Sequence, residues 1–159
     1  MILYFLRHGL AEERFEWVGN DDLRPLTTQG IKNTGQSAEI ISLLDLDLEL
    51  IITSPLVRAY QTAEIVAKRL QMLDRLVKDA RVGPGFGINN LDSIFAAHPG
   101  ISNIMFVGHE PDFSQIVSDL IGGGNIIFKK GGLARVELSG PPSMRGELAW
   151  LIPPRILRS

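Results

Sequence analysis

Three apolar stretches of this chain end in residues that could bind and attack an anion. The three endings are Arg7-His8-Gly9, Thr53-Ser54-Pro55 with Arg58 shortly after, and Gly108-His109-Glu110. Arginine offers phosphoryl oxygens a planar, permanently charged fork, and a neutral imidazole can attack phosphorus. If the endings lie at one edge of a sheet, they predict a pocket for a phosphoryl group and a reaction through a covalent phosphohistidine.

The charges in such a pocket also constrain the two histidines. Nearby positive charge disfavours an imidazolium, so we expect at least one of the two imidazoles to be neutral and nucleophilic near pH 7. The arginines would neutralise the phosphoryl oxygens in the transition state. The sequence therefore predicts neither a metal ion nor a cofactor.

The elements that must position these residues follow from the hydrophobic pattern. Apolar runs alternate with helical periodicity, which predicts an α/β fold with a mostly parallel central sheet. Expected strands cover residues 2–6, about 49–53, 103–107, 133–138 and 147–152, the last two joined by a hairpin connection over 139–146. Expected helices cover 27–44, 54 to about 70, a short stretch near 90–97, and part of 110–124. The carboxyl ends of parallel strands meet at one edge, where ligands bind.

Two helix starts have a recognisable local pattern. Thr27 is expected to cap the first helix, with Ile31, Ala38 and Ile41 on its buried face. Ser54-Pro55 fits an N-cap followed by proline in the first helical position. Helices that start after strands direct their partial positive charge at the same edge.

Composition limits the class of protein. The chain has 159 residues, 45% of them hydrophobic and 21% charged, with no cysteine and a net charge of −2. These values predict a single domain over residues 1–159, without disulfides or a thiolate metal site. No apolar run approaches the roughly 20 residues of a membrane span, and the first residues do not resemble a signal peptide. We expect a cytoplasmic protein that binds neither membrane nor nucleic acid.

Charge is distributed unevenly along the chain. Residues 1–124 carry 10 Lys and Arg against 16 Asp and Glu, whereas residues 125–159 carry 6 against 2. The basic segment at the end of the chain is interpreted as a solvated edge rather than a nucleic-acid site, because no recognition module accompanies it.

The motifs themselves resemble a known family. The stretches LRHG (6–9), SPLVRAYQTA (54–63) and VGHEP (107–111), with RPLTTQG (24–30) as a fourth, are similar to the signatures of the histidine phosphatase superfamily. The resemblance implies a three-layer α/β/α, phosphoglycerate-mutase-like fold. The compact length and the fourth stretch resemble most the SixA-type phosphohistidine phosphatases.

The resemblance also implies roles for individual residues. His8 would be the nucleophile, Arg7 and Arg58 would clamp the phosphoryl oxygens, and His109 would donate a hydrogen bond to the same group. Glu110 stands where some family members have a general acid, although it could equally cap the following helix. Glu12 is a second candidate for a proton donor.

Two features of the stretch before the third motif bear on the substrate. Mutase-like members place a Glu acid after the second motif, but residues 71–102 contain no Glu. Phosphohistidine expels imidazole, a good leaving group, and so needs no strong acid. The short stretch before the third motif also predicts an open site that admits a phosphorylated protein. The favoured function is therefore dephosphorylation of phosphohistidine on a protein.

Two other functions remain open. The chain could be a small-molecule phosphomonoesterase with Glu110 as acid, in which case a positioned donor contributes about 10²–10⁴-fold. It could also be a module that recognises phosphorylated groups without turnover.

Overall fold

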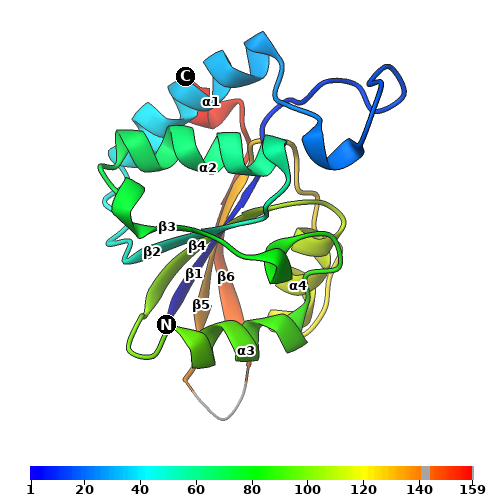
Figure 1. The fold of residues 1–159 in the computed structure, drawn as a ribbon. Helices are drawn as coiled ribbons and strands as arrows, with labels where there is room; N and C mark the ends of the chain where they lie inside the picture. Colours follow the sequence, from blue (N-terminus) through cyan, green and yellow to red (C-terminus); the bar gives the residue numbers. More distant parts are fainter. Residues whose placement is uncertain (141–143, 159) are drawn as a thin grey trace.

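A single six-stranded sheet forms the centre of the molecule. The computed structural model describes residues 1–140 and 144–158, and Figure 1 traces them from the N-terminus to the C-terminus. The strands are β1 (Ile2–Arg7), β2 (Leu50–Thr53), β3 (Leu76–Lys78), β4 (Asn103–Gly108), β5 (Leu133–Leu138) and β6 (Gly146–Ile152). The helices are α1 (Thr28–Ser42), α2 (Val57–Arg69), α3 (Ile88–Ala97) and α4 (Asp112–Leu120), with short 3₁₀ turns at Asp21–Leu23, Leu73–Arg75, Ala80–Val82 and Ile156–Arg158.

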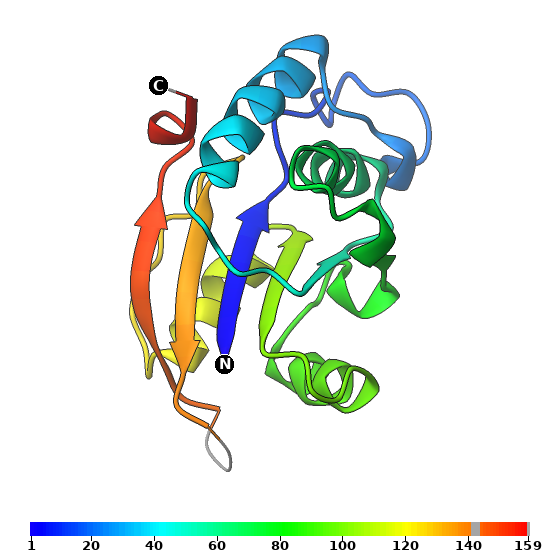
Figure 2. The same cartoon turned by 90° about the vertical axis from the view of Figure 1, so that its left-hand side faces the viewer.

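The strand order is β3-β2-β4-β1-β5-β6. The first four pair in parallel, and β5 and β6 are antiparallel. This is the predicted fold class, a mostly parallel sheet with an antiparallel edge. The arrowhead of β1 points toward the loop that leads into α1 (Figure 2). The predicted connection over 139–146 includes residues 141–143, which lie outside the described residues.

Helices cover both faces of the sheet because the central strands are apolar on both sides. In β1, Leu3 and Phe5 face one cluster, and Tyr4 and Leu6 face the other. The first cluster contains the inner residues of α3 and α4, and the second contains those of α1 and α2. The three-layer α/β/α architecture is therefore confirmed.

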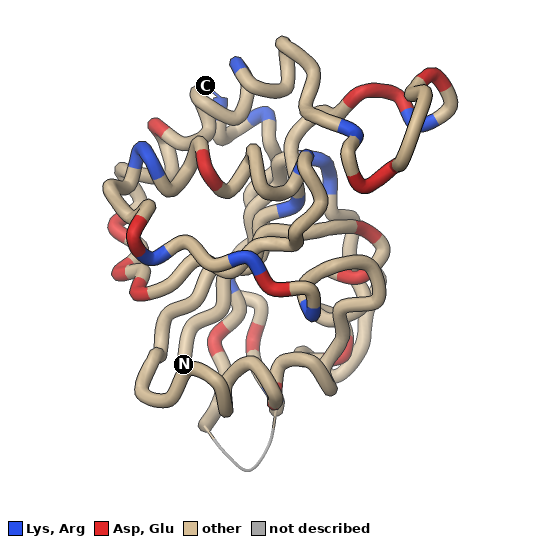
Figure 3. The backbone as a smooth tube through the Cα atoms, in the orientation of Figure 1, with Lys and Arg blue, Asp and Glu red and all other residues tan. Residues whose placement is uncertain are grey.

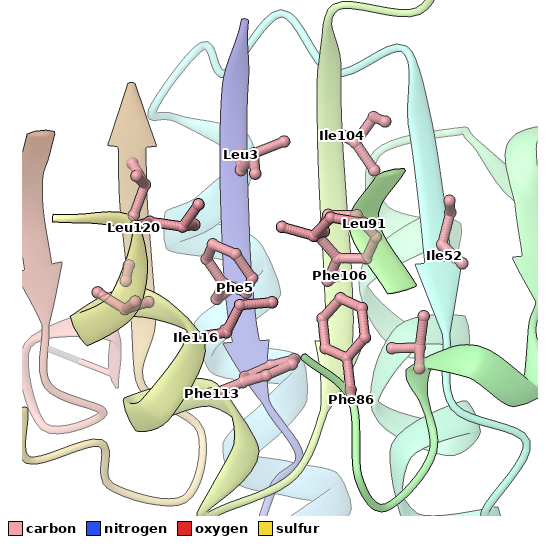
Figure 4. Close-up of a cluster of buried hydrophobic side chains, with 14 of the residues drawn as sticks. Leu3, Phe5, Ile52, Phe86, Leu91, Ile104, Phe106, Phe113, Ile116 and Leu120 are labelled. Atoms are coloured by element: carbon pink, nitrogen blue, oxygen red, sulfur yellow. The ribbon is translucent and has the colours of Figure 1, made fainter. Parts of the chain in front are cut away.

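Aromatic rings fill the first cluster close to the carboxyl ends of β1 and β4. The ring of Phe113 on α4 meets the ring of Phe5 edge to face, with centroids 5.3 Å apart (Figure 4). Phe86 packs on Phe106 at 5.2 Å. Phe86 belongs to the connection between β3 and α3, so its burial anchors that connection to the core. Within the described part of the chain, no helix is long and apolar enough to cross a bilayer.

Two local expectations were wrong. Ile31 is 47% exposed, whereas Ala38 and Ile41 are buried as expected. Helix α2 starts at Val57 and has Leu56 in the N-cap position, so Ser54 does not cap it. Thr27 does cap α1, where its side chain accepts the amide of Gly30 at 2.9 Å.

Candidate active site

A pocket of about 480 Å³ opens where the parallel strands end. Its lining includes five of the residues singled out in the sequence: Arg7, His8, Arg58, His109 and Glu110. They come from β1, from α2 and from the residues just after β1 and β4. The structure therefore brings these side chains together from distant parts of the chain, and basic segments lie near the ends of the central strands in Figure 3.

The pairing of β1 with β4 places the two histidines side by side. Arg7 lies opposite Gly108 in the parallel register, so His8 and His109 follow as neighbours. Their ring centroids are 5.3 Å apart. Gly108 allows the Phe113 ring to pack directly against the backbone of β4, because a Cβ at position 108 would lie only 2.9 Å from that ring. The backbone that carries His109 thus rests directly on the aromatic cluster.

The backbone of His8 is fixed by two neighbouring segments. Its amide donates to the Gly108 carbonyl at 3.0 Å, and its carbonyl accepts from the Gly131 amide at 3.0 Å. Its ring nitrogen Nδ1 lies 2.8 Å from the Gly9 carbonyl. A carbonyl can only accept, so Nδ1 carries the hydrogen and Nε2 keeps its lone pair. The imidazole is therefore held in the tautomer that a nucleophile needs.

Burial keeps both imidazoles neutral. The pKa of His8 is lowered to about 3, first by burial and then by the positive charges around it, although its bond to Gly9 acts in the opposite direction. The pKa of His109 is lowered to about 4, again by burial first and by Arg58 next. Each side chain is 5–6% exposed. The predicted neutral imidazole is thus found twice.

His109 also contacts the end of β2. Its Nε2 lies 2.8 Å from the Ser54 hydroxyl, which in turn accepts the amide of Leu56 at 3.3 Å. Its Nδ1 is buried and has no hydrogen-bond partner among the described residues. Ser54 therefore orients His109 instead of capping a helix.

The two arginines are held in different ways. Arg7 Nη1 donates to the Phe128 carbonyl at 2.6 Å. Arg58 Nη1 and Nη2 donate to the backbone oxygen and the carboxylate of Asp21, at 2.9 and 3.1 Å. Burial lowers the pKa of each guanidinium, but arginine stays charged in proteins. In each residue Nε is buried and has no hydrogen-bond partner within the described chain.

Asp21 is a residue of the site that the sequence analysis missed. Its carboxylate accepts from Arg24 Nε at 2.8 Å as well as from Arg58. The hydrogen bond from Arg24 lowers the pKa of this carboxyl, and the charge of Arg58 adds to the effect. Asp21 and Arg58 are 37 positions apart, so spacing alone could not pair them. In the sequence, Asp21 lies only in the polar stretch GNDDLRP, between the first expected strand and the first expected helix.

The acidic residues near the pocket have distinct positions. Glu110 lines it, but both carboxylate oxygens accept from Ser114, one from the amide at 3.0 Å and one from the hydroxyl at 2.7 Å. Glu110 therefore caps the first turn of α4. Glu13 lines the pocket, whereas Glu12, the second candidate for a proton donor, is not among the residues that line it.

The connection between β3 and α3 forms another part of the wall. Pro84 and Gly85 line the pocket, next to the buried Phe86. The Gly85 amide donates to Asp112 on α4 at 2.9 Å. This connection is thus attached both to the core, through Phe86, and to α4, through Asp112.

Comparison with known proteins identifies the family. Residues 3–82, half of the chain, match the model of the histidine phosphatase superfamily, branch 1. The chain belongs to the histidine phosphatase superfamily. An uncharacterized protein from a Picosynechococcus strain is 38% identical over 120 residues, which cover 72% of this chain and 70% of that protein.

Other members of the superfamily are similar over nearly the full chain. Phosphohistidine phosphatase SixA of Escherichia coli is 25% identical over 157 residues, which cover 97% of this chain and 94% of that protein. The solved structure of protein histidine phosphatase SixA with tungstate has a TM-score of 0.86 at 25% identity and covers 99% of both chains. This histidine phosphatase is therefore a SixA-like phosphatase with a phosphoglycerate-mutase-like fold.

The fold alone does not select a substrate. A mycobacterial glucosyl-3-phosphoglycerate phosphatase shares it with a TM-score of 0.73 at 15% identity, covering 94% of this chain and 97% of that one. The substrate class has to be argued from the site.

Proposed function

We propose that this phosphatase removes the phosphoryl group from phosphohistidine on a protein, through a covalent phosphohistidine at His8. The observation that carries the proposal is the state of His8: a buried, neutral imidazole whose Nδ1 donates to Gly9, which leaves the Nε2 lone pair free in a pocket with two guanidinium groups. No other residue in the pocket combines these properties among the described residues.

The reaction would proceed in two displacements. In the first, Nε2 of His8 forms a bond to phosphorus while the N–P bond of the substrate breaks, and the substrate histidine leaves as an imidazole. In the second, water attacks phosphorus, the bond to Nε2 breaks, and inorganic phosphate is released with the proton from water. Arg7 and Arg58 would stabilise the equatorial oxygens in both transition states, with His109 as a further donor.

Two features favour an N–P bond over a phosphate ester. The carboxylate of Glu110 is already held by the amide and hydroxyl of Ser114, so it is poorly placed to protonate a leaving alkoxide. Residues 71–102 offer no glutamate. An imidazole leaving group needs no such acid. The name of the E. coli relative, a phosphohistidine phosphatase, agrees with this choice.

A small-molecule phosphomonoesterase is the second candidate, because Glu110 and Glu13 still line the pocket. Rates on a phosphohistidine peptide and on an alkyl phosphate separate the two functions. We expect fast turnover of the peptide, slow turnover of the ester, and little effect of Glu110→Gln on the peptide. Turnover confined to the ester and abolished by Glu110→Gln would assign the second function instead. Phosphate binding without turnover of either compound would indicate a recognition module.

A further inference from the structure

Part of the loop between β1 and α1 exposes large apolar side chains next to the pocket. We call residues 13–23 the rim loop. Phe15 is 99% exposed, Val18 is 93% exposed and Leu23 is 60% exposed. Single exposed apolar residues are common, but three on one short loop beside a binding pocket are typical of an interaction surface.

The conformation of the rim loop does not depend on these side chains. The Glu12 amide donates to the Pro25 carbonyl at 2.9 Å, and Arg24 Nη1 donates back to the Glu12 carbonyl at 2.6 Å. Asp21 attaches the loop to Arg58, and the Trp17 indole donates to the Asn20 carbonyl at 3.0 Å. Polar contacts thus fix the loop, and the fold gives no reason for phenylalanine at position 15.

The rim loop lies where a protein substrate has to approach. Glu13, Arg14 and Asp21 line the pocket that contains the deeply buried His8. A histidine side chain that delivers its phosphoryl group to His8 brings its own protein surface against this rim. The loop projects from the body of the molecule (Figures 1 and 2), and three of its residues line the pocket.

The charge of the rim loop indicates the chemistry of the partner. Glu13, Glu16 and Asp22 are exposed, and none of them has an ion-pair partner in the described chain; Arg14 is the one exposed cation of the loop. The pocket is cationic and suits the phosphoryl group, whereas its rim is apolar and acidic. Charge complementarity therefore favours a partner surface with apolar and basic side chains.

We propose that the rim loop is the docking surface for the protein substrate. Phe15 and Val18 contact apolar residues beside the phosphohistidine, and Glu16 and Asp22 face basic ones. This inference rests on the proposed function, since it assumes that the substrate is a phosphohistidine protein.

The test uses three phosphohistidine compounds made with phosphoramidate. They are free phosphohistidine, a peptide whose phosphohistidine is flanked by Leu and Lys, and a peptide of equal length flanked by Ser and Glu. We expect wild type to favour the Leu/Lys peptide at least about tenfold in kcat/KM, through KM. Phe15→Ser with Val18→Ser should remove that preference and leave the rate on free phosphohistidine unchanged.

Glu16→Lys with Asp22→Lys should weaken binding of the Lys peptide and reduce the dependence of that binding on salt.

Leu43→Ser is the matched control, because Leu43 is 76% exposed just beyond the opposite end of α1. It should behave as wild type with all three compounds. Equal rates on both peptides in wild type, with free phosphohistidine turned over, would overturn the docking surface and leave the proposed function intact. If wild type turns over none of the three, the proposed function is wrong and the docking surface with it. A dimer that dissociates in the Phe15/Val18 variant without any change in peptide kinetics would assign the loop to a second copy of the chain.

Discussion

His8 and His109 on the floor of the pocket are 6% and 5% exposed, whereas Phe15 and Val18 on its rim are 99% and 93% exposed. The floor is built at the ends of the most buried strands, where register, backbone hydrogen bonds and the aromatic cluster all fix the same atoms. The rim is fixed by a few polar contacts and leaves its apolar groups in solvent. The difference agrees with the two proposals made above, in which the floor carries out the phosphoryl chemistry that all substrates share and the rim contributes to the choice of substrate.

Replacing His8 should have the largest effect on the floor. We expect His8→Ala to lower kcat by about 10⁴-fold or more on every phosphorylated compound, since a nucleophile cannot be partly replaced. An acid-labile phosphoryl label on the protein should disappear with it. Full turnover in this variant, or an unchanged label, would remove His8 from the mechanism.

A core substitution tests whether the floor depends on the interior and the rim does not. Phe113→Ala should lower the free energy of unfolding by about 3–5 kcal/mol, because Phe113 is fully buried against Phe5 and Phe86. Phe15→Ala also deletes a phenyl ring, but one that is exposed to solvent. This change should alter the free energy of unfolding by about 0.5 kcal/mol or less. Urea unfolding measures both. Similar losses in the two variants would contradict the contrast between floor and rim.

Acid should destabilise the floor selectively. The unfolded state binds protons at an ordinary histidine pKa of about 6.5, whereas the folded pKa values are about 3 and about 4. Stability from these neutral imidazoles is therefore complete above about pH 6.5 and is lost as the pH falls. From the linkage between proton binding and folding, we expect the free energy of unfolding to fall by roughly 2 kcal/mol for each imidazole when the pH is lowered from 7 to 5. Unfolding free energies at the two pH values measure the loss, and His8→Gln should reduce it; an equal pH dependence in that variant would contradict the assignment.

Asp21 connects the two regions and should give the smallest effect. Asp21→Asn keeps an oxygen near Arg58 but removes the charge that it shares with Arg24. The carboxylate is 38% exposed, so we expect a cost of about 1 kcal/mol, or roughly fivefold in kcat/KM. The loss should be equal for free phosphohistidine and for peptides, because Arg58 is expected to contact the phosphoryl group in every substrate. A loss confined to peptides would instead indicate that Asp21 acts through the peptide contacts of the rim loop and not through Arg58.

The sequence predicted most of the floor because its residues lie next to regular elements. Apolar runs located β1, β4 and β5 to within a residue, and parallel pairing then brought Arg7, His8 and His109 to one edge. Strand β3 was missed because it has only three residues with no alternating pattern: Leu76 and Val77 are partly buried and Lys78 is exposed.

The sequence analysis was wrong or incomplete where a residue in a local pattern makes its main contact with a residue far away in the sequence. Ser54-Pro55 has the local pattern of a helix start, but the Ser54 hydroxyl contacts His109, 55 positions away. Asp21 and Arg58 are likewise joined only by the fold. The exposure of Phe15 could not be predicted at all, because an aromatic residue in a loop is equally compatible with burial.

Gly108 has a consequence for motion in this protein. Gly108 has no side chain, so the Phe113 ring lies directly against the backbone of β4, one residue before His109. A shift of that ring would therefore move the backbone that carries His109. We therefore expect a fluctuation that loosens the aromatic rings to reach that imidazole across one peptide unit. The position of the His109 ring is therefore as well defined as the packing of the aromatic cluster. On heating, we expect the ring to become disordered over the same temperature range in which that cluster loses its packing.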